Sequence, residues 1–333
     1  SSSAGSTTKF ALEKEALTAV VSGLDEDEFN VGLMLFSETG SGNSNPSGGY
    51  VRSAIRTMTA QNKSDLIDLI AGFTENGDKG NGAEYALAMH EAYLYFEGLN
   101  ARAGFNKAKR DADAFVSLDN SRYRSPSTNA CVKNYIIFIS NGAPDNGENS
   151  TAGGLLAGLG ANASVIPLSP NTRQANWMDE YARFMAAQGI NTYTIEVNPI
   201  TNGQGPANTA LLRSAALQGQ GDYGQVFTAQ ELKDLLDLTF KKVQAVNSVF
   251  ASTALPVSVN VRGTFLNEVY MGVFRPDEDA GPRWGGNLKL FQFAVDESTD
   301  TLYLADASTP PEPAQSPVTG FIRNTAKSFW TAT

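Results

Sequence analysis

Cysteine and histidine are almost missing from this chain of 333 residues, which has one of each, Cys131 and His90. A zinc site built from cysteine and histidine needs about four ligands, so these two residues cannot form one. Cys131 has no second cysteine for an intrachain disulfide, and we expect a free thiol or a bond to a segment outside this chain. His90 lies in the helical stretch AEYALAMHEAYLYFEG, where a packed histidine is more common than a catalytic one.

Positive charge is scarce as well. The chain has 25 lysines and arginines against 35 aspartates and glutamates, which gives a formal net charge of −10. Because no basic cluster is present, nucleic acid is not an expected partner. No apolar run approaches the ~20 residues that cross a bilayer, so no membrane span is expected.

The sequence up to about residue 247 alternates between helix and strand patterns. Apolar residues at helical spacing predict helices over residues 8–24, 63–73, 84–96, 177–188 and 229–243. The segments NVGLMLF, NYIIFIS and INTYTIEV predict strands between them, and the first is a continuous apolar run typical of a buried strand. This alternation predicts an α/β fold with a doubly wound, largely parallel sheet covered on both faces.

The remaining sequence has a different period. The segments LPVSVNVRG, EVYMGVF, NLKLFQF and TLYLA alternate apolar and polar residues between Pro, Gly and Asp turns, which predicts a small antiparallel β module. We therefore expect two domains, 1–247 and 248–333. The second is too short for a complete β-propeller and is expected to pack against the first domain or another polypeptide.

The loop SNGAPDNGEN, which follows the predicted strand NYIIFIS, carries the oxygen-bearing side chains Asn141, Asp145 and Glu148. Such groups suit calcium or magnesium, although Asn, Gly and Asp also form ordinary turns. A metal-dependent hydrolase that uses the Asp145–Glu148 loop is therefore the alternative hypothesis. No histidine is expected within reach as a general base, so we predict that the chain is not an enzyme.

Several segments resemble a known family. KFALEKEALTAVVSGL, NVGLMLFSE and NYIIFISNGAPDN resemble a von Willebrand factor A domain. YRSPSTNACVKNYIIFISNG, WMDEYARFMAAQGINTYTIEVNP, AVNSVFASTALPVSVN and NEVYMGVFRPDEDAGPRWGGNLKLF resemble the PilY-type tip adhesins of bacterial type IV pili. In that family a C-terminal β-propeller follows the A domain.

This resemblance covers nearly the whole chain and implies a von Willebrand factor A-like fold followed by the start of the propeller module. It also implies a non-enzymatic role in pilus assembly and surface attachment, at the pilus tip on the extracellular side of the cell surface. The implied partners are minor pilins of the pilus tip and host or abiotic surfaces.

A domains of this type hold a divalent ion through an Asp-x-Ser-x-Ser motif, a threonine and an aspartate. The resemblance places Ser1 and Ser3 at the serines, the residues near Ala83 at the threonine and Asn141 at the aspartate. Asn141 is neutral and Ala83 has no hydroxyl, so the site is degenerate and its affinity for calcium or magnesium is weakened. Asp145 is the nearest remaining carboxylate in that loop.

The resemblance also implies a central strand between the strands 31–36 and 135–140, and the sequence before the helix 8–24 contains no apolar run that could supply it. Leaving out a central strand would expose buried N–H and C=O groups, each costing about 1–3 kcal/mol if unpaired. We expect the gap to be filled by upstream residues or by a strand from a separate polypeptide. Direct pairing of the two strands would refute this expectation.

Overall fold

The structure is a computed structural model, and it describes residues 8–36, 47–78, 83–116, 119–127, 134–198, 205–247, 250–252, 268–275, 285–296, 301–315, 322–323 and 325–330. Ser1, Ser3 and Cys131 therefore lie outside the described residues. The chain divides into two compact units, of which unit 1 comprises residues 1–22 and 30–239, and unit 2 residues 23–29 and 240–333. The domain boundary expected between residues 247 and 248 stays a prediction.

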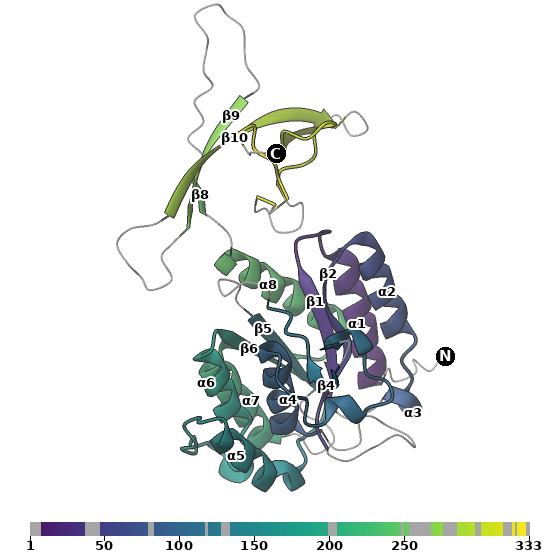
Figure 1. Cartoon of the computed structure of the whole chain (residues 1–333), viewed down its shortest axis with the longest axis vertical. Coiled ribbons are helices and arrows are strands. Elements are labelled where there is room, and N and C mark those ends of the chain that lie inside the picture. Colours follow the sequence, from purple (N-terminus) through teal and green to yellow (C-terminus); the bar gives the residue numbers. More distant parts are fainter. Residues whose placement is uncertain are drawn as a thin grey trace, which may run out of the picture. The chain divides into compact units, whose positions relative to one another are not determined.

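Helices dominate the first part of the chain (Figure 1). The α-helices are α1 (Lys9–Gly23), α2 (Ala60–Ala71), α3 (Glu75–Asp78), α4 (Tyr85–Glu97), α5 (Asn149–Gly158), α6 (Met178–Ala186), α7 (Gly205–Gln218) and α8 (Ala229–Asn247). The short 3₁₀ helices are η1 (Gly104–Asn106), η2 (Ala112–Ala114), η3 (Asn146–Glu148) and η4 (Asn171–Arg173).

The strands separate into antiparallel pairs and one parallel sheet. They are β1 (Asn30–Leu35), β2 (Tyr50–Thr57), β3 (Phe115–Val116), β4 (Asp119–Tyr123), β5 (Asn134–Ser140), β6 (Ile190–Val197), β7 (Gln220–Val226), β8 (Phe250–Ser252), β9 (Glu268–Arg275), β10 (Gly285–Asp296) and β11 (Thr301–Ala305).

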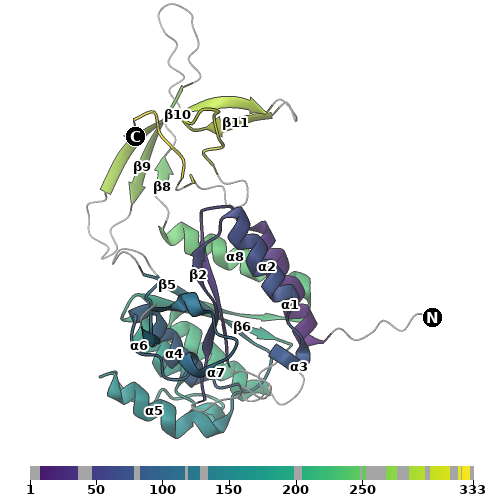
Figure 2. The same ribbon diagram turned by 45° about the vertical axis from the view of Figure 1, so that its right-hand side comes forward.

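A parallel sheet of order β5-β6-β7 forms the centre of unit 1. Its middle strand β6 is buried along almost its whole length, as expected for a strand that has neighbours on both edges. Helices α6 and α7 pack against β6 and each other (Figures 1 and 2). Together with the antiparallel sheet that follows, this arrangement confirms the predicted α/β class with a parallel sheet, followed by a small antiparallel β module.

Helix α4 carries most of the core of unit 1. Eleven of its residues are buried, so it is apolar on nearly every side, as in a helix enclosed by other elements. At its first turn the Tyr85 ring lies 4.8 Å from the ring of Phe138 in β5 and 5.6 Å from the ring of Phe36 beside β1. His90 is a packed residue, with its Nδ1 3.2 Å from the Tyr181 hydroxyl.

Strand β1 differs from its prediction. It is not a buried parallel strand, because it pairs in antiparallel fashion with β2 and five of its six residues are only half-buried. The sequence analysis did not predict β2. Among the described residues, β1 has β2 as its one strand partner and β5 has β6, so β1 and β5 do not pair with each other. Direct pairing of β1 with β5, which would refute the expected central strand, is therefore not observed among the described residues. That another strand fills the place between them stays a prediction.

Unit 2 contains an antiparallel sheet of order β11-β10-β9-β8. Its core contains Val269, Met271, Phe291 and Ala314. The predicted segment LPVSVNVRG lies outside the described residues. Across the described parts of both units, no helix has both the length and the apolarity needed for a transmembrane span.

The proline-rich loop after β11 is fixed by one carboxylate. Asp306 is 2% exposed and accepts hydrogen bonds from the backbone N–H groups of Ser308 (2.9 Å), Glu312 (3.1 Å) and Lys327 (3.0 Å). Burial works to raise the pKa of Asp306, but these hydrogen bonds outweigh it and hold the pKa below its ordinary value.

Candidate functional site

The carboxyl ends of β5, β6 and β7 meet at one edge of the parallel sheet, which is where ligands bind in open α/β folds. Glu196, near the end of β6, is fully buried there. Its carboxylate accepts hydrogen bonds from Asn208 Nδ2 (3.0 Å), Thr209 Oγ1 (2.9 Å) and the Tyr223 hydroxyl (2.6 Å). The Glu196 carboxylate therefore links β6 to α7 and β7 through these hydrogen bonds.

Tyr223 shows the effect of that arrangement. Burial, together with the neighbouring Glu196 carboxylate, raises the pKa of Tyr223 to about 12, so its hydroxyl stays protonated and donates to Glu196. Glu196 was not predicted as a site residue. The available signal was a glutamate in INTYTIEV, a segment predicted to be a strand of a covered sheet, because a carboxylate in a buried strand needs partners.

Asn141, the predicted metal-site residue, lies just beyond β5. Its Nδ2 donates to Glu13 Oε2 at 3.0 Å, and its backbone carbonyl accepts from Lys9 Nζ at 3.0 Å. Burial raises the pKa of Glu13 to about 7 and lowers the pKa of Lys9. Both partners lie in the first turns of α1. The start of α1 therefore contacts the loop that follows β5.

This donor set does not fit a divalent cation. The Lys9 ammonium already contacts the Asn141 carbonyl, and a second cation beside it would meet electrostatic repulsion. Asn141 also directs its amide N–H toward Glu13, whereas calcium and magnesium need oxygen ligands. Ser1 and Ser3 lie outside the described residues. Among the described residues, no group of three or more His, Cys, Asp or Glu side chains could hold a metal ion.

Tyr85 and Ser140 are buried at the end of β5 and bond to each other. The Tyr85 hydroxyl bonds to the Ser140 hydroxyl and to the Gly142 carbonyl, and burial raises the pKa of Tyr85 above its ordinary value. Ser140 Oγ also lies 3.0 Å from the Gly142 carbonyl oxygen. These contacts fix the path of the chain out of β5, and they leave both side chains in structural hydrogen bonds.

Asp145, the second predicted ligand, caps a helix turn. Its Oδ1 accepts from Gly147 N at 2.9 Å at the start of η3, and its own N–H donates to the Ala83 carbonyl at 2.9 Å. The loop that carries Asp145 thus meets the loop that carries Ala83. Asp145 and Asn141 have separate partners, and the structure does not join them in one ligand set.

Glu148 has a different role from the one in the hydrolase hypothesis. It is 3% exposed and accepts from Leu87 N (2.9 Å) and from Asn176 Nδ2 (2.6 Å). It therefore supplies from outside the helix the N-terminal cap that α4 lacks, since the Glu84 side chain makes no capping hydrogen bond. Burial raises the pKa of Glu148 to about 7, and its hydrogen bonds oppose that rise.

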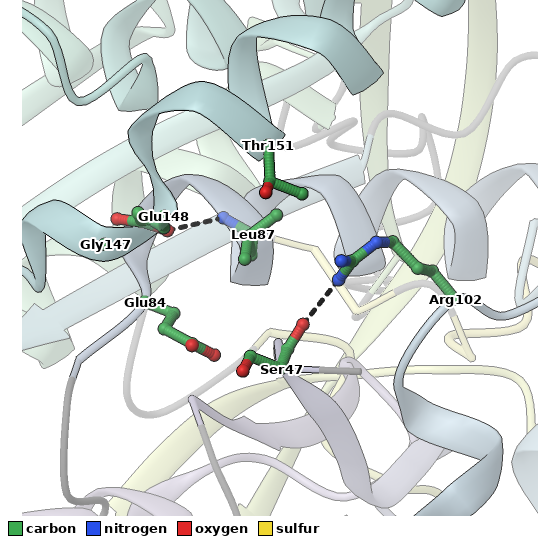
Figure 3. A pocket seen from close by; sticks show the side chains of 7 residues that line it. All are labelled: Ser47, Glu84, Leu87, Arg102, Gly147, Glu148 and Thr151. Atoms are coloured by element: carbon green, nitrogen blue, oxygen red, sulfur yellow. Dashed lines mark hydrogen bonds between the residues drawn. The ribbon is translucent and has the colours of Figure 1, made fainter. Parts of the chain in front are cut away.

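A cleft of about 490 Å³ opens beside this loop. It is lined by Ser47, Glu84, Leu87, Arg102, Gly147, Glu148 and Thr151. Figure 3 shows the Glu84 and Arg102 side chains entering the cleft from opposite sides, with Ser47 between their tips. Arg102 Nη1 donates to the Ser47 carbonyl, and burial raises the pKa of Glu84.

The backbone at Arg102 is held by a buried carboxylate. Glu91 of α4 is fully buried and accepts from the N–H groups of Arg102 (3.2 Å), Ala103 (3.0 Å) and Gly104 (2.9 Å). The Tyr123 hydroxyl donates to the same carboxylate at 2.7 Å. One side chain of the core helix therefore positions the segment that carries Arg102 into the cleft.

Comparison with known proteins finds several structural likenesses, three of which follow. No protein-family model matches the chain, and no curated protein matches it. The conserved hypothetical protein BatB from Bacteroides thetaiotaomicron has 14% identity and a TM-score of 0.41, over 71% of this chain and 89% of that one. An aerotolerance-related membrane protein from Bacteroides fragilis has 13% identity and a TM-score of 0.40, over 70% and 89% of the two chains.

The third likeness is to the pilus adhesin SpaC from Lactobacillus rhamnosus GG. It has 11% identity and a TM-score of 0.42, and it covers 90% of this chain but 35% of SpaC. This chain therefore spans about a third of that adhesin. At these scores the likenesses assign neither a family nor a function, and the fold class stated above rests on strand pairing and helix packing.

Proposed function

We propose that this chain is a non-enzymatic binding module of a bacterial surface structure, which acts in surface attachment and in pilus assembly at the tip of a type IV pilus. The sequence resemblance to PilY-type tip adhesins supports the pilus assignment. Minor pilins and host or abiotic surfaces are the partners that this proposal names. The extracellular location follows from the same proposal.

The observation that supports a binding module is that the polar side chains at the carboxyl edge of the sheet form hydrogen bonds to other groups of the protein. Glu196, Glu148 and Asn141 each hold other parts of the fold in place through hydrogen bonds. A carboxylate that acts as a general base needs access to a substrate proton, and these side chains are directed at protein groups. The edge is thus a fixed scaffold from which loops can contact a partner.

Binding to purified minor pilins tests the proposal directly. The chain is immobilised and exposed to each minor pilin of the same bacterium in a biolayer interferometry experiment, with the major pilin as the control. Beads coated with the chain are then compared with albumin-coated beads for retention on glass and on host cells under flow. Saturable binding to a minor pilin, together with excess bead retention, is the expected result. Failure of both assays would overturn the proposal.

The alternative hypothesis, a metal-dependent hydrolase, has its own test. Phosphate-ester and peptide substrates are incubated with the chain and calcium, magnesium or manganese, alongside Glu148→Gln. Turnover that requires both the metal and Glu148 would replace the binding proposal with the enzymatic one.

A further inference from the structure

The cleft beside α4 holds two opposite charges that do not meet. Glu84 and Arg102 both line it, and they enter it from opposite sides (Figure 3). Among the described residues, Glu84 and Arg102 form no ion pair with each other, although four other arginine or lysine side chains pair with carboxylates at 2.5–3.7 Å. The cleft thus keeps a carboxylate and a guanidinium apart.

The Glu84 carboxylate has an acceptor atom to spare. Its Oε2 is buried and has no hydrogen-bond partner among the described residues. A buried acceptor without a donor is unfavourable by about 1–3 kcal/mol. A ligand ammonium group reaching Oε2 would remove that penalty and supply an opposite charge at the same time.

Arg102 has donors to spare on the facing wall. A guanidinium has about five N–H donors, and within the part of the chain that the structure describes the Arg102 side chain gives one hydrogen bond, to the Ser47 carbonyl. Its backbone is fixed independently through Glu91. The remaining N–H groups suit a carboxylate, which a guanidinium binds through two parallel hydrogen bonds.

We propose that this cleft binds a small zwitterion, with the ligand ammonium on Glu84 and the ligand carboxylate on Arg102. A ligand with only a positive charge would be repelled by Arg102, and one with only a negative charge would be repelled by Glu84. The same repulsion from Arg102 disfavours a divalent metal ion. Glu148, in the same wall, is occupied by Leu87 and Asn176 and shapes the cleft without taking part in binding.

The size of the cleft agrees with this ligand class. Its volume of about 490 Å³ lies within the ~300–1,000 Å³ that is usual for small-molecule sites. Amino acids and short ω-amino acids carry the two charges on a backbone of a few atoms. This inference does not depend on the attachment role, because a zwitterion site would serve a binding module and an enzyme alike.

Isothermal titration calorimetry with ω-amino acids of increasing length tests the proposal. The probes are glycine, 4-aminobutanoate and 6-aminohexanoate, titrated into the full chain at neutral pH. N-acetylglycine lacks the ammonium and glycinamide lacks the carboxylate, so these two compounds serve as the controls for each charge. We expect saturable binding that is strongest at one chain length and at least about tenfold weaker for both controls.

Substitutions in the cleft test whether the probes bind there. Glu84→Gln removes the charge and keeps the side-chain shape, whereas Arg102→Gln replaces the guanidinium with a shorter neutral amide. Each is expected to weaken binding of the preferred probe by about tenfold or more. Glu97→Gln and Arg213→Gln change exposed charges outside the cleft and are expected to bind as the unmodified chain does. Circular dichroism and thermal melting establish that the two cleft variants are folded.

Three results would overturn the proposal. They are the absence of saturable binding for all three zwitterions, binding of N-acetylglycine or glycinamide as tight as that of the zwitterions, and unchanged binding in folded Glu84→Gln and Arg102→Gln. Each of these results leaves the attachment assays unaffected, so failure of the cleft proposal is distinguishable from failure of the proposed function.

Discussion

Replacement of Glu91 by leucine is expected to destabilise unit 1 by about 4 kcal/mol. The carboxylate accepts four hydrogen bonds, and leucine accepts none. Each buried donor that loses its acceptor costs about 1–3 kcal/mol. Three of the four bonds are buried and one is part-buried, so water can satisfy part of the loss. Because domains are stable by only about 5–15 kcal/mol, this variant should lose a quarter or more of the stability of unit 1.

The cost of burying the charge of Glu91 acts against the stabilisation by its hydrogen bonds. Burial raises the pKa of Glu91, which means that ionising it inside the protein is unfavourable. Buried charges replaced by apolar residues sometimes stabilise a fold. If burial of the charge were the larger effect, Glu91→Leu would be neutral or stabilising. We expect the hydrogen bonds to outweigh it, because four donors converge on one carboxylate and would remain unpaired.

A graded series of variants separates the two effects in urea denaturation followed by circular dichroism. Tyr123→Phe removes one donor and is expected to cost about 1 kcal/mol. Glu91→Gln keeps one acceptor but turns an amide N–H toward a backbone donor, and is expected to cost about 2–3 kcal/mol. The order Tyr123→Phe, Glu91→Gln, Glu91→Leu is therefore one of increasing destabilisation. A loss below about 1 kcal/mol in Glu91→Leu would refute the reasoning.

Three further predictions concern other parts of the chain. Glu148 has a pKa of about 7 in the folded chain against an ordinary 4.5, so the folded state binds more protons between these values. Its contribution to the unfolding free energy should then fall by about 3 kcal/mol as pH rises from about 4 to about 8. Denaturation over a pH series should show a flatter slope for Glu148→Gln, and an unchanged slope would contradict the assignment. Asp306→Ala should destabilise unit 2 by about 2–4 kcal/mol, because it leaves the donors of the loop after β11 unpaired, and proteolysis within residues 306–315 should accelerate while Glu312→Gln has no such effect. Calcium or magnesium should change the melting temperature by less than about 1 °C, because a ligand raises the melting temperature only if it binds the folded state. A larger shift that Asp145→Ala abolishes would show that the loop does bind a metal.

The elements predicted correctly are those with strong apolar patterns. Helix α4 is enclosed by other elements and is apolar on nearly all sides. Strand β6 is also enclosed, and its β-branched and aromatic residues favour a strand. Helix α5 was missed because its sequence NSTAGGLLAG is rich in glycine, which has a low helix propensity. Strand β7 was missed because QGDYGQV contains few apolar residues, and its pairing with β6 is a tertiary effect.

The site was predictable only in part. Asn141 and Asp145 were located correctly in the loop after β5, because strand ends mark the carboxyl edge of a parallel sheet. Their partners were not predictable, since the contact between Lys9 and Asn141 joins residues 132 positions apart. Glu91 and Glu196 left a detectable signal, a carboxylate within a segment that the sequence predicts to be covered by other elements. The cleft between Glu84 and Arg102 left none, because their proximity depends on the packed fold.

The edges of β1 and β5 that have no strand partner among the described residues have a consequence for measuring the proposed attachment. In that part of the chain each of these strands pairs with another strand on one edge only, and most of their apolar side chains are half-buried. Such an edge can hydrogen-bond to almost any extended chain. A preparation of the chain alone should therefore self-associate as its concentration rises, and it should adhere to unrelated proteins and plastic without using its own binding surface. Adhesion that survives a saturating excess of an unrelated strand-forming peptide is the part that reflects function.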